Sequence, residues 1–413
     1  MDAHSGVPFM VDDLMPARRS LRVAVVSETY PPEINGVAAT IARVVDGLRL
    51  RGHEVQLVRP RQDRSEAAAD GPGFAELLMR GLPIPRYPQL KLGLPARRAL
   101  VRHWTTHRPD VVHIVTEGPL GWSALQAAAH LRLPVVSDFR TNFHAYSQHY
   151  GVAWLRDPIM AYLRKFHNRT ACTMVPTETL RTELRASGFR RLRVVSRGVD
   201  SRQFDPAKRN AALRSAWGAG DSDTVLICVG RLAPEKNLGA LVAAWQAMRE
   251  QDPDVRLVLV GDGPERARLQ QRCPAAVFAG VRRGEDLAVH YASADVFVFP
   301  SLTETFGNVV PEAMASGLAV LGHQYAAAAQ LVRHEENGLL VPFGDDQAFV
   351  AMARGLAGQR ERIQALGQAA RLTATHQDWA HVVAKVESEY LAAMADGGLS
   401  ATRPAWSPAM PAA

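Results

Sequence analysis

Short apolar runs alternate with helical patterns through both halves of the chain, and this alternation constrains the fold more than any other feature. In the first half, the run at 21–26 leads through a Gly-containing loop into a helical pattern that reaches Arg51, with Gly52 as its C-cap. In the second half, the run at 224–229 leads through a loop into a helical pattern that reaches Met248. Strands that alternate with helices are typical of parallel sheets with helices on both faces. An α/β protein is therefore predicted.

Length and composition allow two such sheets. The chain has 413 residues, and 47% of them are hydrophobic, which is enough for two cores. We expect a mobile leader over residues 1–20, a first domain over 21–199 and a second domain over 200–373. A last helix is expected over 374–396. The tail at 397–413 is rich in Ala and Pro and is expected to be disordered.

The cysteines and the charge limit the compartment and the partners. Cys172, Cys228 and Cys273 form no CxxC pair, which indicates buried thiols in a reducing compartment. No apolar run approaches the roughly 18 residues of a membrane helix, and the N-terminus lacks the apolar core of a signal peptide, so a cytoplasmic protein is expected. The net charge of +7 suits nucleic acid, anionic lipid or anionic substrates. Because the basic residues are scattered and no nucleic-acid motif is present, we expect no nucleic-acid partner.

One strand-to-helix transition in the second half carries the strongest functional signal. The apolar run at 296–299 predicts a buried strand, and the pattern after Asn308 predicts a helix. Asn308 suits the N-cap, and Pro311 falls in the first turn, where a missing N–H costs nothing. The loop between them lies beyond the carboxyl end of a strand, which is the ligand crevice of an open α/β sheet.

Two carboxylates flank this crevice. Glu304 lies on the loop, and Glu312 lies early in the helix. The free N–H groups at the helix start, with Phe306 and Gly307 before them, favour an anion. The arrangement suits the diphosphate of a nucleotide-sugar, with one Glu on the sugar hydroxyls and the other on the ribose.

Glu304 and Glu312 are separated by seven residues, with Phe306-Gly307 and Pro311 between them. This pattern resembles the paired-Glu signature of retaining GT-B glycosyltransferases, the group of bacterial glycogen synthases, sucrose synthases and α-mannosyltransferases of glycolipid assembly. The resemblance spans residues 21–393. It implies two Rossmann-like doubly wound domains that face each other across a cleft, with the acceptor on the first and the nucleotide-sugar on the second. It also implies a hinge at Ser196 to Asp200 and a last helix that crosses back onto the first domain.

The resemblance extends to the segment after the run at 224–229. In the family, this segment places an Arg and a Lys on the donor diphosphate, and here they are Arg231 and Lys236. Negative charge grows on the leaving nucleoside diphosphate, so fixed cations there stabilise the transition state more than the ground state. The run at 277–281 corresponds to the loop that meets the nucleobase through backbone groups. The donor-binding residues implied are Gly36, Gly230, Arg231, Lys236, Val281, Glu304, Phe306, Gly307, Asn308, Val309 and Glu312.

Two loops of the first half complete the implied site. The loop after the first strand resembles the one in which Gly36 lets the backbone approach the donor phosphates and the acceptor. Relatives carry a His directly after the aromatic residue of a later loop, where this chain has Arg140. Arg140 as an anion-binding group and His144 as a polar contact are both candidate catalytic residues. The resemblance does not choose between them.

The reaction implied is transfer of a hexose from a nucleoside-diphosphate sugar to a hydroxyl group, with retention at the anomeric carbon. With no evident nucleophile, it implies front-face attack in which the leaving phosphate helps to take the acceptor's proton. No Asp-x-Asp motif lies near the site, and Arg231 and Lys236 can supply the charge that a metal would provide. We therefore expect no metal and no cofactor beside the nucleotide-sugar co-substrate.

The N-terminal half indicates the substrates. The segments at 31–37 and 90–95 look closest to GDP-mannose-dependent α-mannosyltransferases that act on lipid acceptors. Sulfoquinovosyl- and glucosyl-diacylglycerol synthases come second. A lipid or glycan acceptor is expected, and the donor base and the linkage stay open.

Two interpretations of residues 81–108 also stay open. Leu and Tyr are mixed here with basic residues, namely Arg86, Lys91, Arg97, Arg98 and Arg102. A basic amphipathic segment would lie on an anionic bilayer and give a peripheral contact at the inner face of the cell membrane. The alternative is a solvated helix that packs on the sheet.

Two functions of other classes share the predicted fold. A nucleotide-sugar epimerase or NAD enzyme would require G-x-G-x-x-G, but Gly261 and Gly263 are followed by Arg266 where the third Gly belongs. A catalytically inactive nucleotide-sugar-binding protein would keep every element, and Arg140 in place of the usual His is its support.

Overall fold

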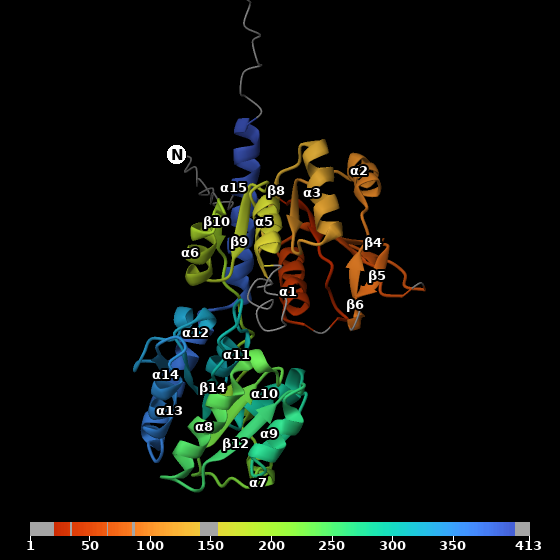
Figure 1. Ribbon diagram of the computed structural model, residues 1–413. Helices are drawn as coiled ribbons and strands as arrows, with labels where there is room; N and C mark the ends of the chain where they lie inside the picture. Colours follow the sequence, from red (N-terminus) through yellow and green to blue (C-terminus); the bar gives the residue numbers. More distant parts are fainter. Residues whose placement is uncertain (1–19, 34, 64, 85–86, 141–155, 401–413) are drawn as a thin grey trace, which may run out of the picture.

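Two α/β domains make up the protein, one above the other in the orientation of Figure 1. The computed structural model describes residues 20–33, 35–63, 65–84, 87–140 and 156–400. Each domain has its own sheet, and helices pack on both faces of each sheet. The prediction of two Rossmann-like doubly wound domains is confirmed.

The sheet of the N-terminal domain has the strand order β10-β9-β8-β7-β1-β2-β4-β3. Its strands are β1 Arg22–Val26, β2 Glu54–Pro60, β3 Asp70–Gly71, β4 Phe74–Met79, β7 Val111–Ile114, β8 Val135–Asp138, β9 Cys172–Val175 and β10 Leu192–Val194. Neighbouring strands are parallel except β3 and β4. All residues of β7, β8 and β9 are buried, as expected for parallel strands covered on both faces.

The helices of this domain divide between the two faces of the sheet. They are α1 Gly36–Leu50, α2 Arg97–Thr106, α3 Pro119–Leu131, α5 Arg156–His167 and α6 Glu178–Ala186, joined by the last helix of the chain, α15 Trp379–Ser400. The apolar side chains of α1 and α15 share one core with the sheet. Those of α2 and α3 fill the core on the opposite face.

The sheet of the C-terminal domain is parallel throughout, in the order β13-β12-β11-β14-β15-β16. Its strands are β11 Val225–Val229, β12 Arg256–Val260, β13 Val277–Gly280, β14 Val296–Phe299, β15 Ala319–His323 and β16 Leu339–Val341. Its helices are α7 Ala211–Ala216, α8 Leu238–Arg249, α9 Arg266–Arg272, α10 Gly284–Ala292, α11 Val309–Ala315, α12 Ala326–Leu331, α13 Asp346–Arg354 and α14 Arg360–Thr375, with short 3-10 turns η2 Pro206–Lys208 and η3 Pro234–Lys236.

Each sheet has a point where the strand order reverses direction. In the N-terminal sheet the reversal lies between β1 and β7, and in the C-terminal sheet between β11 and β14. Ligands of open α/β sheets bind outside the carboxyl ends of the strands at such points. The loops after β11 and β14 therefore mark where a ligand belongs in the C-terminal domain.

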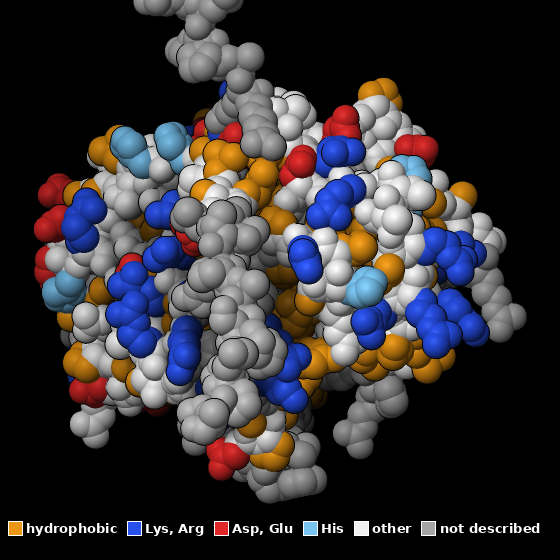
Figure 2. Space-filling view, turned by 90° about the horizontal axis from the view of Figure 1, so that it is seen from above, with side chains coloured by type: hydrophobic (Ala, Val, Ile, Leu, Met, Phe, Trp, Pro, Cys, Tyr) orange, Lys and Arg blue, Asp and Glu red, His pale blue; other side chains and the backbone are white. Residues whose placement is uncertain are grey.

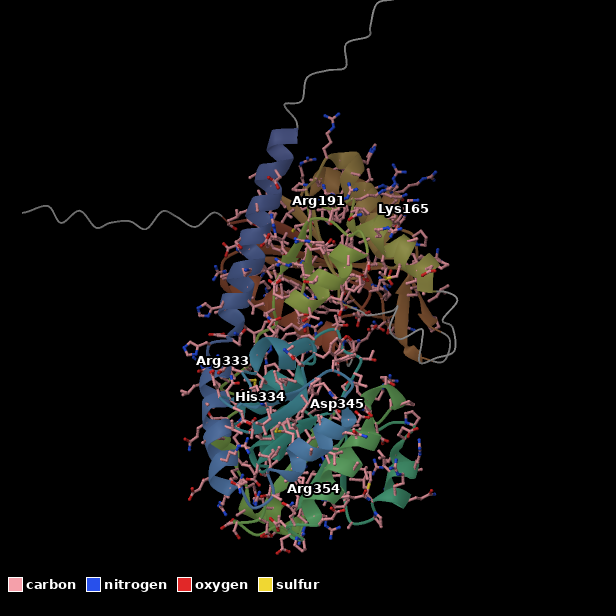
Figure 3. The ribbon with its side chains drawn as sticks, turned by 60° about the vertical axis from the view of Figure 1, so that its left-hand side comes forward. Lys165, Arg191, Arg333, His334, Asp345 and Arg354 are labelled. Carbon is pink, nitrogen blue, oxygen red and sulfur yellow. The ribbon has the colours of Figure 1, made fainter. Side chains whose placement is uncertain are left out.

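Helix α15 returns from the C-terminal domain to the N-terminal one, and Figures 1 and 3 show it along the side of that domain. It packs against α1, and its side chains Val383, Val386 and Tyr390 are buried in the core of the N-terminal sheet. Before α15 the chain passes the crossing between the domains, where the N–H of Val199 donates to the carbonyl of Gln377 at 2.8 Å. The two passages between the domains therefore lie side by side.

The structure corrects the expectation for residues 81–108. Residues 81–93 form an antiparallel β-hairpin, β5 Gly81–Ile84 and β6 Tyr87–Gly93, and the helix α2 begins only at Arg97. The helical interpretation of 81–93 is wrong, because prolines such as Pro83 are excluded from a helix interior but tolerated in an isolated hairpin. In α2, Leu100 and Trp104 are fully buried and face α3, so this part is a surface helix. Strand β4, between 74 and 79, was not expected.

The three cysteines are buried and unpaired, as predicted. Burial raises the pKa of the Cys172 and Cys228 thiols to about 12, which makes them poor nucleophiles. Within the described ranges, no helix has the length and hydropathy needed to cross a bilayer.

Candidate active site

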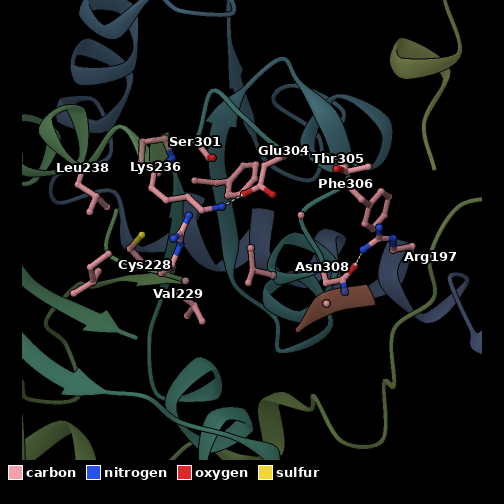
Figure 4. A pocket seen from close by; sticks show the side chains of 18 of the residues that line it. Arg197, Cys228, Val229, Lys236, Leu238, Ser301, Glu304, Thr305, Phe306 and Asn308 are labelled. Carbon is pink, nitrogen blue, oxygen red and sulfur yellow. Dashed lines mark hydrogen bonds and ion pairs between the residues drawn. The ribbon is translucent and has the colours of Figure 1, made fainter. Parts of the chain in front are cut away.

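A cavity of about 290 Å³ lies where the two domains meet, and Figure 4 shows it from close by. The C-terminal domain contributes the loops after β11 and β14. The N-terminal domain contributes the start of α1 and the segments that follow β8 and β10. The lining residues with functional predictions are Gly36, Arg140, Gly230, Arg231, Lys236, Glu304, Phe306, Gly307, Asn308 and Val309. Ten of the predicted site residues therefore lie around one cavity.

The loop after β14 holds Glu304 at the cavity wall. The hydroxyl of Tyr325 donates to the backbone carbonyl of Glu304 at 3.0 Å. Gly307 has φ +90°, and a Cβ there would lie 2.9 Å from Cζ of Phe299, so the turn requires glycine. With Phe306 1% exposed, the loop is anchored at two points before Gly307.

Asn308 stands at the predicted N-cap position but does not cap the helix. Its backbone is already helical, at φ −55° and ψ −26°, and its side chain makes no capping hydrogen bond. Instead, Oδ1 accepts a hydrogen bond from Nη1 of Arg197 at 3.1 Å, drawn as a dashed line in Figure 4. The predicted capping role is therefore wrong, because Asn308 uses its side chain to join the two domains.

The two predicted diphosphate cations lie together on the same wall. Arg231 follows β11 directly, and Lys236 ends the 3-10 turn η3. Nζ of Lys236 forms an ion pair with Oε1 of Glu304, and Arg231 pairs with the buried Glu235. Each cation is thus held by a carboxylate while it faces the cavity.

Arg140 and Arg197 bring positive charge from the N-terminal domain. Nε and Nη2 of Arg140 each lie 2.5 Å from Oδ2 of the buried Asp138. Burial acts to raise the pKa of Asp138, but Arg140 and His113 outweigh it and lower the pKa to about 2. Burial, with repulsion from Arg140, lowers the pKa of Arg197 to about 9.

Gly36, the first residue of α1, lies near the C-terminal domain. Asn35 caps α1, its Oδ1 accepting from the backbone N–H groups of Val37 at 3.1 Å and Ala38 at 2.8 Å. A Cβ on Gly36 would lie 3.5 Å from Nδ2 of Asn308. The first turn of α1 thus forms part of the cavity wall.

The cavity is strongly cationic. Among the described residues, four cationic side chains and a single carboxylate line it. The carboxylate, Glu304, already pairs with Lys236. Cations at the carboxyl ends of parallel strands are suited to a substrate with two negative charges, such as a diphosphate.

Two predicted site residues do not line this cavity, and a third lies outside the described residues. Glu312 is largely buried, and Oε2 accepts a hydrogen bond from the hydroxyl of Tyr291 at 3.1 Å. Val281 is 56% exposed on the loop after β13. His144 lies outside the described residues. The predicted roles of these three stay predictions.

Arg197 is the site residue that the sequence did not reveal. It lies in the segment with the pattern of a hinge, and its place at the cavity depends on how the two domains meet. Its guanidinium carbon also lies 5.6 Å from the centre of the Phe306 ring. The arginine itself, between Ser196 and Gly198 of the hinge segment, is the local signal.

Comparison with known proteins agrees with this geometry. Residues 34–203 match the family described as Glycosyltransferase Family 4, and residues 223–359 match Glycosyl transferases group 1. A GDP-mannose-dependent alpha-mannosyltransferase of Mycobacterium tuberculosis is 38% identical over 331 residues, which are 79% of this chain and 85% of the relative. The protein belongs to the GT-B glycosyltransferases of group 1.

Further relatives of this glycosyltransferase extend the match over nearly the whole chain. A GDP-mannose-dependent alpha-mannosyltransferase of Mycolicibacterium smegmatis is 36% identical over 92% of this chain and 100% of its own. A sulfoquinovosyl transferase of Arabidopsis thaliana is 30% identical over 90% of this chain and 74% of its own. The solved structure of sucrose-phosphate synthase from Thermosynechococcus elongatus shares the fold, with a TM-score of 0.75 at 21% identity over 91% of this chain and 100% of that one.

Proposed function

We propose that this glycosyltransferase transfers mannose from GDP-mannose to a hydroxyl group of a lipid or glycan acceptor, with retention at the anomeric carbon. The observation that carries the proposal is the cationic cavity at the switch point of the C-terminal sheet, with Arg231, Lys236 and Glu304 on one wall. The names of the relatives at 36% and 38% identity support mannose and guanosine diphosphate.

Different charged residues bind different parts of the donor. Arg231 and Lys236 bind the diphosphate and stabilise the charge that it gains as the glycosidic bond breaks. Glu304 binds hydroxyls of the transferred sugar, and its ion pair with Lys236 couples the sugar position to the leaving group. Glu312 is kept as the ribose ligand predicted from the sequence.

Transfer with retention follows from attack on the face that the leaving group occupies. The acceptor oxygen bonds to the anomeric carbon while the bond from that carbon to the diphosphate oxygen breaks. The electron pair stays on the diphosphate oxygen, and this oxygen takes the proton of the acceptor hydroxyl. Either Arg140, which lines the cavity, or His144 contacts the acceptor side of the reaction, and Arg140 is the candidate for binding an anionic group.

The reaction requires no metal in this proposal. The four cationic side chains at the cavity supply fixed positive charge where other transferases use a divalent ion. Activity is therefore expected to be equal with and without a chelator.

We further propose a cytoplasmic enzyme that contacts the inner face of the membrane. Arg97, Arg98 and Arg102 are exposed on α2 of the N-terminal domain. Leu82 and Leu92 are 54% and 39% exposed on the hairpin that precedes α2. Figure 2 shows groups of Lys and Arg side chains, with hydrophobic ones between them, over this end of the molecule. Basic and apolar side chains together favour an anionic bilayer.

A second candidate is transfer from a UDP-sugar to a diacylglycerol. The sulfoquinovosyl transferase at 30% identity supports it. A donor screen separates the two. Release of nucleoside diphosphate would be followed with GDP-mannose, UDP-glucose and UDP-sulfoquinovose, in the presence of EDTA and a panel of lipid and glycan acceptors.

The proposal predicts acceptor-dependent release of GDP from GDP-mannose alone. Turnover only with a UDP-sugar would favour the second candidate. Lack of turnover with every donor, in a protein that still binds one of them, would indicate a binding protein and refute the proposed enzyme. Abolition of activity by EDTA, restored by a divalent ion, would refute metal independence.

A further inference from the structure

A buried line of polar side chains connects the last helix with the active-site cavity. The hydroxyl of Tyr390, on α15, lies 2.8 Å from Nδ1 of His113, on β7. Nε2 of His113 lies 2.9 Å from Oδ2 of Asp138, at the end of β8. The same carboxyl oxygen holds the guanidinium of Arg140, which lines the cavity. Tyr390 and the side chain of His113 are fully buried.

The chemistry of each group fixes the direction of these contacts. Asp138 is ionised, so a lone pair on Nε2 of His113 would face its negative charge at 2.9 Å; the hydrogen is therefore on Nε2, although its N–H is not aligned on Oδ2 as in a regular hydrogen bond. In the neutral ring, Nδ1 is then an acceptor and takes the hydroxyl hydrogen of Tyr390. Tyr390 thus selects the tautomer that presents N–H to Asp138. Without that hydroxyl, the hydrogen can move to Nδ1, and a lone pair on Nε2 would face the carboxylate.

We propose that Tyr390 and His113 are positioning residues that act on the reaction through Asp138, by fixing the guanidinium of Arg140 in the cavity. The inference rests on the proposed function, which places Arg140 beside the reacting groups. It goes further in assigning a kinetic role to the last helix. A group held in one geometry costs no reorganisation when charge develops, so loss of this support slows the reaction without removing a substrate contact.

If Tyr390 only helped α15 to pack on the N-terminal domain, its buried contacts toward His113 and Asp138 would have no evident purpose. Docking of α15 already has another polar anchor, because Glu387 contacts Arg51 and His53. Its apolar side chains Val383 and Val386 are buried in the core. Among the described side chains of α15, only Tyr390 connects, through His113 and Asp138, to a residue of the cavity. Glu387 is therefore a matched control on the same helix, three positions before Tyr390.

The test is a double-mutant cycle between Tyr390→Phe and Arg140→Ala. Tyr390→Phe is expected to lower kcat/KM roughly tenfold, mainly through a lower kcat. The reason is that the variant loses the hydroxyl contact with His113, which is about one hydrogen bond. In the Arg140→Ala background, the same change is expected to lower kcat/KM less than twofold. Glu387→Gln is expected to lower Tm and to leave kcat/KM within twofold of the wild type.

Equal losses from Tyr390→Phe in both backgrounds would overturn the proposal, and so would a loss of the same size in Glu387→Gln. Conservative rescue gives a second check. His113→Gln keeps an N–H near the Nε2 position, so it is expected to retain more kcat than His113→Ala at equal Tm. Equal kcat in the two His113 variants would contradict the positioning role.

A spectroscopic signature separates failure of this inference from failure of the proposed function. The ¹⁵N shifts of the His113 ring, assigned by their loss in His113→Gln, report which nitrogen carries hydrogen. Tyr390→Phe is expected to change them toward the other tautomer whether or not any donor is turned over. An unchanged spectrum would overturn the inference, while absence of turnover with every donor would refute only the proposed function.

Discussion

At the residue scale, the contact between Lys236 and Glu304 determines how the cavity handles charge. The Nζ–Oε1 ion pair holds both groups at one place, although they come from loops 68 positions apart. A diphosphate must compete with Glu304 for this ammonium group. Lys236 stabilises the transition state when negative charge grows on the leaving group, because its ammonium group is already in position.

Lys236→Ala is expected to lower kcat/KM for GDP-mannose by about 100-fold or more, the loss seen when one preorganised charge-stabilising group is removed. Steady-state kinetics check this. The control is Lys208→Ala, which removes another lysine of the C-terminal domain, paired with Glu285 outside the cavity. Comparable losses in the two variants would argue against a specific role for Lys236.

Glu312 gives a prediction about pH and stability. Burial raises its pKa to about 7 from the ordinary value of 4.5, although the hydrogen bond from Tyr291 acts to lower it. Between pH 4.5 and 7 the folded protein therefore binds more protons at this site than the unfolded chain does. Stability from the neutral carboxyl is present below pH 4.5 and is lost as pH rises through 7.

Glu312→Gln removes this titration. Relative to the wild type, the variant is expected to become more stable as pH rises across that window, by up to roughly 3 kcal/mol in the free energy of unfolding. Urea titrations at several pH values measure the difference. A constant difference between the two proteins from pH 4.5 to 8 would contradict a raised pKa at Glu312.

At the element scale, the turn before α11 holds the loop of Glu304 in shape. Gly307 combines a left-handed backbone with contact to Phe299, so a side chain there meets strain and a steric clash together. Gly344 has a similar φ, +79°, but open space around its Cβ position. Alanine substitutions at these two glycines therefore distinguish the cost of backbone strain from the cost of a steric clash.

Gly307→Ala is expected to destabilise the protein by about 2–3 kcal/mol and to raise the KM for the donor. Gly344→Ala is expected to cost about 1 kcal/mol, because it adds only backbone strain. Thermal unfolding and donor kinetics provide the measurements. A cost at Gly307 no greater than at Gly344, with an unchanged KM, would contradict the role assigned to this turn.

The elements also explain what the sequence predicted well. Arg231, Lys236 and Glu304 lie on loops directly after parallel strands, so a local pattern is enough to bring them to one edge of the sheet. The hairpin β5–β6 depends on pairing between segments, which a local basic and apolar pattern does not encode. The inward side chain of Glu312 depends on Tyr291 from another helix. Arg197 becomes a site residue only through the way the domains meet.

At the scale of the whole molecule, the N-terminal domain is proposed to rest on the membrane while the cavity faces the donor. Replacing Arg97, Arg98 and Arg102 with Gln removes three exposed positive charges from α2. Each is worth about 1 kcal/mol near an anionic surface, so binding to phosphatidylglycerol vesicles is expected to fall roughly 100-fold at low salt.

Vesicle sedimentation measures this loss. Replacing Arg266, Arg268 and Arg272 of α9 with Gln makes the same change of charge in the other domain and is expected to leave vesicle binding nearly unchanged. Equal effects of the two triple variants would show that net charge, rather than a face of the N-terminal domain, governs binding.

The stereochemistry of transfer tests the central claim most directly. The protein would be incubated with GDP-mannose and its acceptor, and the one-bond carbon–hydrogen coupling at the anomeric centre of the new linkage would be measured by NMR before any hydrolysis of the product. An α-linked mannose, with the configuration of the donor, is the result that front-face attack beside Arg231 and Lys236 predicts. A β-linked product would contradict the account.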